Sequence, residues 1–460
     1  MTGFNLNDLS QLTLAPAGTP PFQTTYGNFA PRIGGAYQLI PSRNFATVLR
    51  GGFGLFYDLA SSEIANIVDD DAYPFGVFQS LPDTTFPIEP PPAPPQILVP
   101  TPSSGVIGGF DPHLKLPLTY QWNVSLEQGL GSHQSYSLSY VGALGTRLLQ
   151  SAYVNAPTPN TYLFNAATLV ANTGSSNYNA LQVQFNRSLQ SGLQALVSYT
   201  WSHSIDTASA GSSYNATNAA GPGVNQNANR GDSDFDIRNS FSAGLTYTIP
   251  SLKSPPLLKA VSGGWSIESI ILARSAPPVT VTDNTFYQLR QYYAAIRPDI
   301  TPGIPLYLYG KQYPGGKAIN NTPGAVPGGC SNGNQSIGPF CGPPVDASGN
   351  PIRQGDLGRN TLRGFGATQL DLALHRDFAL HDEIKLQFRA ELFNVFNHPN
   401  FGPPDGGLYD QTFGLSTEML GQFLNGGLQG SAGLQGSGGF SQLYQIGGPR
   451  SIQVALKLSF

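Results

Sequence analysis

The sequence is poor in charged residues, cysteine and long apolar runs. Asp, Glu, Lys and Arg together make up 11% of its 460 residues, against about 25% in ordinary soluble domains. A net charge of −4 excludes the strongly basic surface typical of nucleic-acid-binding proteins, so we expect no nucleic-acid partner. Two cysteines are too few for a disulfide scaffold or a four-cysteine zinc site. Because no run of about 18 apolar residues occurs, the sequence predicts no transmembrane helix.

Signals for export and for catalysis are also missing. The first ten residues, MTGFNLNDLS, contain neither a basic nor an apolar segment, so they do not have the pattern of a signal peptide. The motifs G-x-S-x-G, H-E-x-x-H and G-x-x-x-x-G-K-[ST] do not occur. The six histidines share no tight ligand spacing. We therefore expect no enzyme activity, no cofactor and no metal site.

The sequence is rich in turn formers and in Tyr and Phe, and its main pattern is alternation. Glycine and proline (54 and 39) make up about a fifth of the chain. In 118–128, Tyr120, Trp122 and Val124 alternate with polar residues, which places the two kinds of side chain on opposite faces of a strand. Eleven segments show this pattern: 29–40, 44–58, 117–128, 133–144, 178–188, 193–204, 237–249, 264–281, 366–377, 384–395 and 449–460.

The connections between these segments alternate between short and long. The short turns are 41–43, 129–132, 189–192 and 378–383, with a medium one at 250–263. The long loops are 59–116, 145–177, 205–236, 282–365 and 396–448. Compact soluble domains rarely contain loops beyond about 15 residues, whereas outer-membrane barrels combine short periplasmic turns with long extracellular loops.

These features predict an all-β fold, an antiparallel transmembrane β-barrel segment of about 11–12 strands within 29–460. The predicted strands have the length that a tilted transmembrane strand needs. A soluble β-sandwich, with the aromatic residues in its core, is the alternative. An odd number of strands leaves the first and last parallel, so they cannot close an antiparallel barrel. Either residues 1–28, which we otherwise read as an extracellular loop, contain a further strand, or the chain is part of a larger barrel.

Several stretches resemble the C-terminal barrel portion of TonB-dependent outer-membrane receptors, in particular the Oar-like branch. They are NFAPRIGGAYQL (28–39), VLRGGFGLFYD (48–58), LTYQWNVSLEQ (118–128), YVGALGTRL (140–148), SNYNALQVQFNRS (176–188), VSYTWSHSID (197–206), DFDIRNSF (234–241), GRNTLRGFG (358–366), RAELFNVFNHPNF (389–401) and GGPRSIQVALKLSF (447–460). They cover nearly the whole chain in the order that the family has.

The resemblance implies half of a 22-stranded barrel in the outer membrane of a Gram-negative bacterium. It also implies a plug and a TonB box, which this chain does not show. The expected partners are outer-membrane lipid, the barrel-assembly machinery, the TonB complex through the missing N-terminal part, and an external ligand. A siderophore, a glycan and a peptide all remain open as ligands. The alternatives are a passive porin-like channel and a surface adhesive or structural protein.

Charged residues on the polar faces of the strands are the candidates for contact with a plug or a passing ligand. The alternative is that they only solvate the wall and pair across strands. They are Arg50, Asp58, Glu268, Arg274, Asp371, Lys385, Arg389 and Glu391.

Two shorter features, a cysteine pair and the C-terminal residues, carry separate predictions. Cys330 and Cys341 lie in the longest loop and predict a disulfide in an oxidising compartment; two free thiols in a cytosolic protein are the alternative. Alternating residues that end in Leu456, Leu458 and Phe460 resemble the C-terminal signal read by the barrel-assembly machinery, or form a plain last strand.

The spacing of Asp232, Asp234 and Asp236 is reminiscent of a calcium loop, but the required glycine and glutamate are replaced by Ile237 and Ala243. A polar loop that enters a strand is the favoured interpretation.

Overall fold

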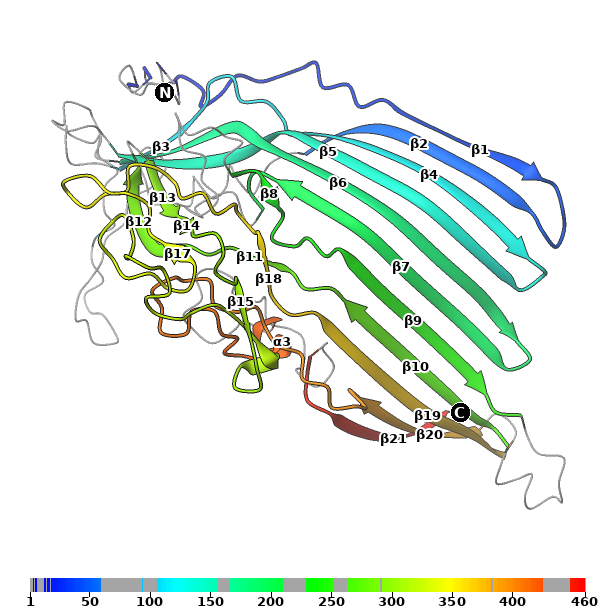
Figure 1. Cartoon of the computed structure of the whole chain (residues 1–460). Helices are drawn as coiled ribbons and strands as arrows, with labels where there is room; N and C mark the ends of the chain where they lie inside the picture. The colour runs from blue at the N-terminus through cyan, green and yellow to red at the C-terminus, as the bar shows by residue number, and fades with distance from the viewer. Residues whose placement is uncertain are drawn as a thin grey trace.

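The computed structural model describes residues 18–58, 106–155, 166–209, 229–250, 263–289, 292–381, 384–424 and 447–459, with residues 3, 5, 12, 13, 15, 16 and 93. Eleven long strands follow one another in chain order as one curved antiparallel sheet (Figure 1). They are β1 (Arg32–Ile40), β2 (Thr47–Tyr57), β4 (Leu118–Leu130), β5 (Gln134–Asn155), β6 (Ala166–Gln190), β7 (Leu193–Asp206), β9 (Asn239–Thr248), β10 (Trp265–Arg274), β19 (Ala367–His381), β20 (Ile384–Phe393) and β21 (Ser451–Ser459). The predicted all-β fold is confirmed. No helix among the described residues is long and apolar enough to span a membrane.

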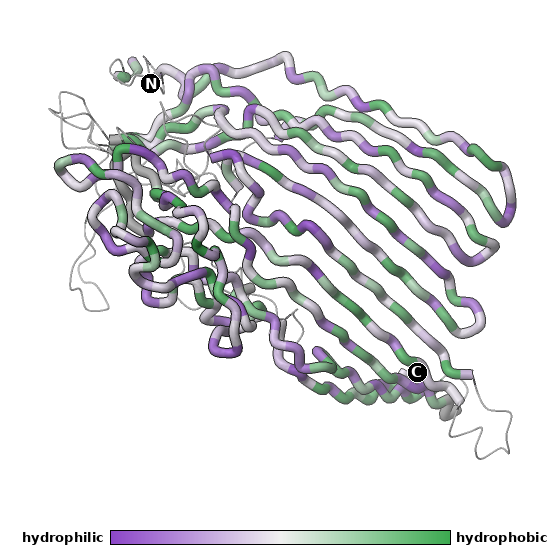
Figure 2. Tube along the Cα trace, in the orientation of Figure 1, coloured by the Kyte–Doolittle hydropathy of each residue, from purple (hydrophilic) through white to green (hydrophobic). Residues whose placement is uncertain are grey.

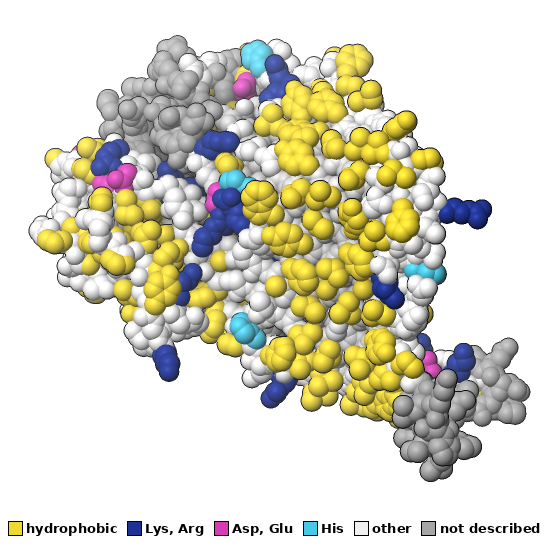
Figure 3. Space-filling view, turned by 45° about the vertical axis from the view of Figure 1, so that its right-hand side comes forward, with side chains coloured by type: hydrophobic (Ala, Val, Ile, Leu, Met, Phe, Trp, Pro, Cys, Tyr) yellow, Lys and Arg dark blue, Asp and Glu magenta, His cyan; other side chains and the backbone are white. Residues whose placement is uncertain are grey.

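Strand pairing places the alternating side chains in rows on two different faces. One row across β4 to β7 consists of Val124, Tyr140, Leu181 and Trp201, which are between 37% and 58% exposed. We call this side of the sheet the apolar face. Figure 2 shows the alternation along each strand, and Figure 3 shows hydrophobic side chains spread over the strands. Such a contiguous exposed apolar surface fits contact with lipid.

The opposite side, the polar face, carries small and hydrophilic residues in the same register. The next row along the strands is Ser125, Ser139, Gln182 and Thr200. Because a shift of one residue would exchange the two faces, this pattern fixes the register of the whole sheet.

The turns at one end of the sheet are tight. Ser191 and Gly192 connect β6 to β7 with positive φ angles of 52° and 78°. A two-residue type I′ hairpin turn requires positive φ at both positions. A Cβ atom on Gly192 would lie 2.5 Å from the carbonyl oxygen of Thr248, so only glycine fits. We call this the turn end of the sheet and the opposite end, where the long connections gather, the loop end.

One predicted loop is wrong, because 145–177 is strand over most of its length. β5 continues to Asn155 and β6 begins at Ala166, and the short strand β3 (Val106–Phe110), inside the predicted loop 59–116, pairs parallel with β6. Residues 166–171 of β6 are buried. A strand covered on both faces has no alternating pattern, so period two could not detect it.

Other boundaries also differ from the prediction. The segment 264–281 leaves the sheet after Arg274, because Pro277 and Pro278 cannot donate ladder hydrogen bonds. The segment 205–236 contains the end of β7 and the short strand β8 (Gly231–Asp232).

The connections 282–365 and 396–448 are long, as predicted, but they fold. The first contains β12 (Asp283–Leu289), β13 (Tyr292–Ile296), β14 (Asp299–Ile300), β15 (Tyr307–Tyr309), η3 (Pro314–Gly316), β16 (Lys317–Ile319), β17 (Phe340–Cys341) and β18 (Leu362–Arg363), which pairs with β11 (Pro278–Val279). The second contains α3 (Leu420–Leu424).

These segments form a unit with its own core at the loop end (Figure 1). We call residues 275–366 and 394–424 the loop subdomain. Its buried apolar side chains come from both connections and from β11: Val279, Val281, Ile319, Phe340, Leu357, Leu362, Leu408 and Phe413. A connection with a core of this size is a folded domain and not a flexible loop.

The eleven-stranded sheet is open at both edges. Among the described strands, β1 pairs only with β2, and β21 pairs only with β20. Residues 18–31 form no strand. Because the path from β1 to β21 has eleven antiparallel members, its two edge strands run in the same direction.

Candidate functional site

Three of the charged residues predicted to line the lumen meet on the polar face. Arg389 of β20 places Nη2 2.9 Å from Oε2 of Glu268 on β10, and Nε 2.7 Å from Oε1 of Glu391. The Nδ1 atom of His375, on β19 between them, lies 3.4 Å from Oε1 of Glu268. We call these four residues the polar-face cluster. Its ion pair between Glu268 and Arg389 links β10 to β20 across β19.

The remaining predicted residues lie apart from this cluster. Arg50 pairs with Glu127 on the next strand, with 2.9 Å between Nε and Oε1. The carboxylate of Asp371 accepts hydrogen bonds from the Gln369 side chain and from the Asn394 amide. Asp58 follows β2, Arg274 ends β10, and Lys385 lies at the start of β20. The sequence alone did not indicate which of the eight would meet.

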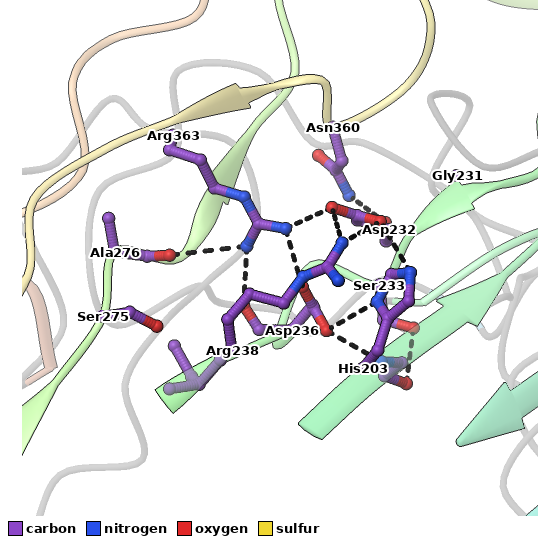
Figure 4. A network of polar contacts seen from close by, with 12 residues as sticks. His203, Gly231, Asp232, Ser233, Asp236, Arg238, Ser275, Ala276, Asn360 and Arg363 are labelled. Atoms are coloured by element: carbon purple, nitrogen blue, oxygen red, sulfur yellow. Dashed lines mark hydrogen bonds and ion pairs between the residues drawn. The ribbon is translucent and has the colours of Figure 1, made fainter. Parts of the chain in front are cut away.

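A larger polar network lies at the loop end, and we call it the loop-end network (Figure 4). Two guanidinium groups and one imidazole ring converge there on two carboxylates. Arg238 donates from Nε to Oδ2 of Asp236 (2.8 Å) and from Nη2 to Oδ2 of Asp232 (3.2 Å). Arg363 reaches the same two carboxylates from the loop subdomain, 2.7 Å from Asp236 Oδ2. The Nδ1 atom of His203 lies 3.2 Å from Asp236 Oδ1.

Asp236 is the most buried carboxylate of this group, with 1% of the residue exposed. Its Oδ1 also accepts the backbone N–H of Ser204, at 2.7 Å. Burial by itself raises the pKa of a carboxyl group. At Asp236 the hydrogen bonds from Ser204, Arg363 and His203 and the charge of Arg238 outweigh burial and lower the pKa below its ordinary 3.8. Asp236 is therefore ionised at neutral pH.

Arg359 extends the loop-end network to a buried position between the end of β7 and the loop subdomain. Its side chain is 2% exposed, and it pairs with Asp206 at the end of β7, whose side chain is 3% exposed. Its Nε donates to the Asn229 carbonyl oxygen (2.9 Å), and its Nη1 lies 3.3 Å from Oδ1 of Asp234. One guanidinium therefore ties the end of β7 and the 229–234 segment to the loop subdomain.

A second buried arginine lies beside it. Arg297 is 4% exposed and donates to the side-chain oxygen of Asn229 and the backbone oxygen of Leu357, at 2.9 and 3.0 Å. Burial and the nearby charge of Arg359 lower the pKa of Arg297 to about 10. It keeps its proton at neutral pH, and its hydrogen bonds replace the water that burial removes.

The loop-end network has the donor atoms of a metal site but not its electrostatics. One ligand atom each of His203, Asp232 and Asp236 lie within 4.8 Å of one another. Both carboxylates already accept from Arg238 and Arg363, which a divalent cation would have to displace. The residues therefore fit an internal ion-pair lock and not a cation site. No calcium loop forms here, and the Asp-rich segment leads into β9 as a polar loop.

Cys330 and Cys341 are joined by a disulfide, with 5.3 Å between their Cα atoms. Cys341 is a buried member of β17, which pairs with β14 in the loop subdomain. The disulfide ties the 331–340 segment to this pair of strands.

At the C-terminus, Leu456 and Leu458 lie opposite Phe388 and Leu386 on the apolar face and are 69% and 54% exposed. Phe460 lies outside the described residues. Recognition by the assembly machinery stays a prediction.

Sequence reasoning missed the residues that make the loop-end network: His203, Asp206, Arg359 and Arg363. Their segments were among the stretches that resembled the family, but Arg359 and Arg363 meet aspartates more than 120 positions away, as the 131 positions between Arg363 and Asp232 show. A charge pattern of arginines in GRNTLRG and aspartates in DSDFD was the signal available. It gave no information about contact.

Residues 1–424 match the family described as "Outer membrane beta barrel domain". No curated protein matches the chain. The chain is similar in structure to the outer membrane transporter YddB from Escherichia coli, with a TM-score of 0.44 and 10% identity over 81% of this chain and 37% of that one.

It is also similar to the ferric-catecholate import receptor Fiu from E. coli K12 (TM-score 0.38, 8% identity, 93% of this chain and 34% of that one). A third is the siderophore receptor PirA from Acinetobacter baumannii (TM-score 0.37, 8% identity, 84% and 39%). The chain spans little more than a third of the length of these structures.

Proposed function

The chain belongs to the outer membrane beta barrel domain family, and from that premise we propose that it is the barrel part of a TonB-dependent receptor that takes up an external ligand. Membership of the family places the chain in the outer membrane of a Gram-negative bacterium. The TonB complex, the plug and the ligand belong to the proposal.

One observation carries this proposal: the large loop connections form a folded subdomain that is locked to the sheet. Arg359 and Arg363 of the loop subdomain bind Asp206, Asp232 and Asp236 at the loop end of the sheet. A receptor has to hold its ligand-binding groups in a fixed position above the lumen. Buried ion pairs stabilise little by themselves but favour one arrangement over others, which is what such a subdomain needs.

The open sheet supports a role as part of a larger assembly. The two edge strands of the described sheet run in the same direction, so its path of eleven strands closes no antiparallel barrel by itself, nor with a second copy of that path in the same membrane orientation. An additional segment with an odd number of strands does close it. A 22-stranded barrel would need eleven further strands, and in the proposed receptor this segment, with the plug, forms the rest of the protein.

The polar-face cluster suits the lumen of such a receptor. Glu268, Arg389 and Glu391 are partly exposed and point to the side of the sheet that would face a plug. We propose that this cluster contacts the plug or the passing ligand.

The test is to purify the native gene product from the outer membrane and measure three properties: its intact mass, its heat-modifiable migration and its binding to the periplasmic domain of TonB. We expect a mass well above 48.8 kDa, a migration that changes on boiling, and binding to TonB. A product of 48.8 kDa that conducts ions in a planar bilayer and does not bind TonB would instead be a passive channel. Migration unchanged by boiling would contradict a closed barrel.

A further inference from the structure

A cavity of about 660 Å³ opens in the loop subdomain, away from both charged clusters. This volume lies in the range of small-molecule sites, about 300–1,000 Å³. Its apolar floor includes Ile337, Leu408 and Phe413. The polar residues that line it are Asp283, Asn321, Asn334, Gln335, Tyr409, Asp410 and Gln411.

Tyr409 is held in place at this cavity. Burial of its hydroxyl group raises the pKa of Tyr409, while the neighbouring side chains of Asn334 and Asn332 act in the opposite direction. The residue is still 44% exposed. A Cβ atom on Gly342 would lie 2.2 Å from Nδ2 of Asn332 and 3.3 Å from the Tyr409 hydroxyl. Glycine at that position therefore lets the two side chains pack closely. The phenol ring is a fixed and accessible aromatic surface.

The other walls are also fixed by hydrogen bonds. The Asn321 side chain donates to the Phe413 backbone oxygen at 3.2 Å, and Pro323 and Ile337 form an isolated β-bridge. The Phe413 amide donates to the backbone oxygen of Asp410, at 3.1 Å. The Cys330 amide donates to the backbone oxygen of Asn334, at 3.2 Å, beside the disulfide. A cavity with preformed walls loses little conformational entropy on binding.

The charge of the lining decides between ligand classes. Among the described residues that line the cavity are two carboxylates, of Asp283 and Asp410, and no lysine or arginine. Such a lining repels anionic ligands. Among the described residues, the only group of acidic and histidine side chains close enough to hold a metal is the one in the loop-end network, so the cavity does not fit a bare cation. Leu408 and Phe413 in its floor are almost completely buried, at 1% and 2% exposure, so the cavity presents little apolar surface to the side chains of a peptide.

The remaining chemistry is that of a neutral polyol. Amide and carboxylate groups of Asn321, Gln411 and Asp410 can exchange hydrogen bonds with vicinal hydroxyls. An accessible aromatic ring such as Tyr409 packs against the apolar C–H face of a sugar.

We propose that this cavity binds a neutral oligosaccharide, with Tyr409 as the stacking surface and Asp410 and Gln411 as hydroxyl ligands. The inference rests on the proposed receptor function, of which it names the ligand class.

The experiment measures binding to the complete protein purified from the outer membrane in detergent. The probes are xylohexaose, cellohexaose, mannohexaose and maltohexaose, with tetragalacturonate and a ferric tris-catecholate as anionic probes. Isothermal titration and saturation-transfer NMR detect binding as weak as a dissociation constant of about 1 mM. We expect at least one neutral probe to bind saturably and both anionic probes to fail.

The variants locate the site. Tyr409→Ala and Gln411→Ala should each weaken binding at least about tenfold, which corresponds to about 1.4 kcal/mol. Because the Gln411 side chain is exposed, its removal leaves folding intact even if Tyr409→Ala disturbs it. The matched control is Tyr309→Ala, an exposed tyrosine of β15 that is 72% exposed and does not line the cavity.

Three outcomes would overturn the oligosaccharide proposal: no neutral probe binds, an anionic probe binds better, or both cavity variants bind like the control. The receptor proposal is tested separately by TonB binding, so either can fail while the other stands.

Discussion

The guanidinium of Arg359 and the carboxylate of Asp206 form a buried ion pair across 153 positions of the sequence. Both side chains are almost completely excluded from solvent, at 2% and 3% exposure. This pair joins the end of β7, a strand of the long sheet, to the loop subdomain. Four predictions follow from this arrangement and from the subdomain that it holds.

Removal of the Arg359 charge should release the loop subdomain from the sheet. In Arg359→Leu, the Asp206 carboxylate stays buried without its partner, which costs about 3–5 kcal/mol. We expect faster cleavage by proteinase K in the loop subdomain, while the sheet stays protected. The control is Arg353→Ala, since Arg353 is half-exposed in its pair with Asp299 and such a pair contributes about 0–1 kcal/mol. Equal cleavage rates for the two variants would contradict the locking role of Arg359.

Acid should loosen the loop-end network at Asp236. Its pKa in the folded protein lies below the ordinary 3.8, so its stabilising effect is present above that value and is lost as the pH falls through the folded pKa. Hydrogen exchange at the Ser204 amide, which donates to Asp236, measures this directly. Protection corrected for the intrinsic rate should persist at pH 3.8, the ordinary pKa of the carboxyl group, and should fall only as the pH is lowered further.

Asp236→Asn is the control for this titration. Its amide oxygen can still accept from Ser204, but the side chain no longer titrates in this range. We expect lower protection at neutral pH and a flatter pH profile. The same pH dependence in both proteins would assign the effect to another group.

Loss of the disulfide should destabilise the loop subdomain and leave the sheet unchanged. The bond closes a segment with a sequence separation of 11, and a loop of that size contributes about 3 kcal/mol in the chain-entropy model. The double variant Cys330→Ser/Cys341→Ser should show increased hydrogen exchange in 322–342. Exchange in β4 to β7 should match that of the parent protein. Loss of protection in those strands would show that the subdomain and the sheet unfold together.

The core of the loop subdomain depends on Phe340. This side chain is 0% exposed and meets Phe413 edge to face, with 5.8 Å between ring centroids. Phe340→Ala should cost about 3–5 kcal/mol and should lower the midpoint of thermal unfolding of the subdomain. The matched control is Phe396→Ala, because Phe396 is 76% exposed and its removal leaves no cavity. A similar midpoint for both variants would contradict an independent core.

Most of the sheet could be predicted from the sequence, because its two faces meet different surroundings. Segments such as 118–128 and 384–392 alternate strictly, and they became β4 and β20. The prediction failed where this contrast disappears. In 166–171, AATLVA, both faces are buried, so the strand β6 begins well before its alternation does.

The candidate sites were less predictable, because they depend on contacts between distant segments. The alternation correctly placed Glu268, Arg389 and Glu391 on one face, but only the stagger of β10, β19 and β20 made them neighbours. Arg359 and Arg363 had no local signal of burial, since arginine in a Gly/Asn-rich segment resembles an exposed loop residue.

The existence of the eleven strands and of their two faces could be predicted from the order of residues, because both are set by neighbouring residues and the pleat of a strand. The folding of a long connection around Phe340 and Leu362, and the pairing of its arginines with Asp206 and Asp236, depend instead on the three-dimensional arrangement. Those contacts lower the free energy only when segments more than 100 positions apart come together, as Arg359 and Asp206 show at 153, so no local pattern encodes them.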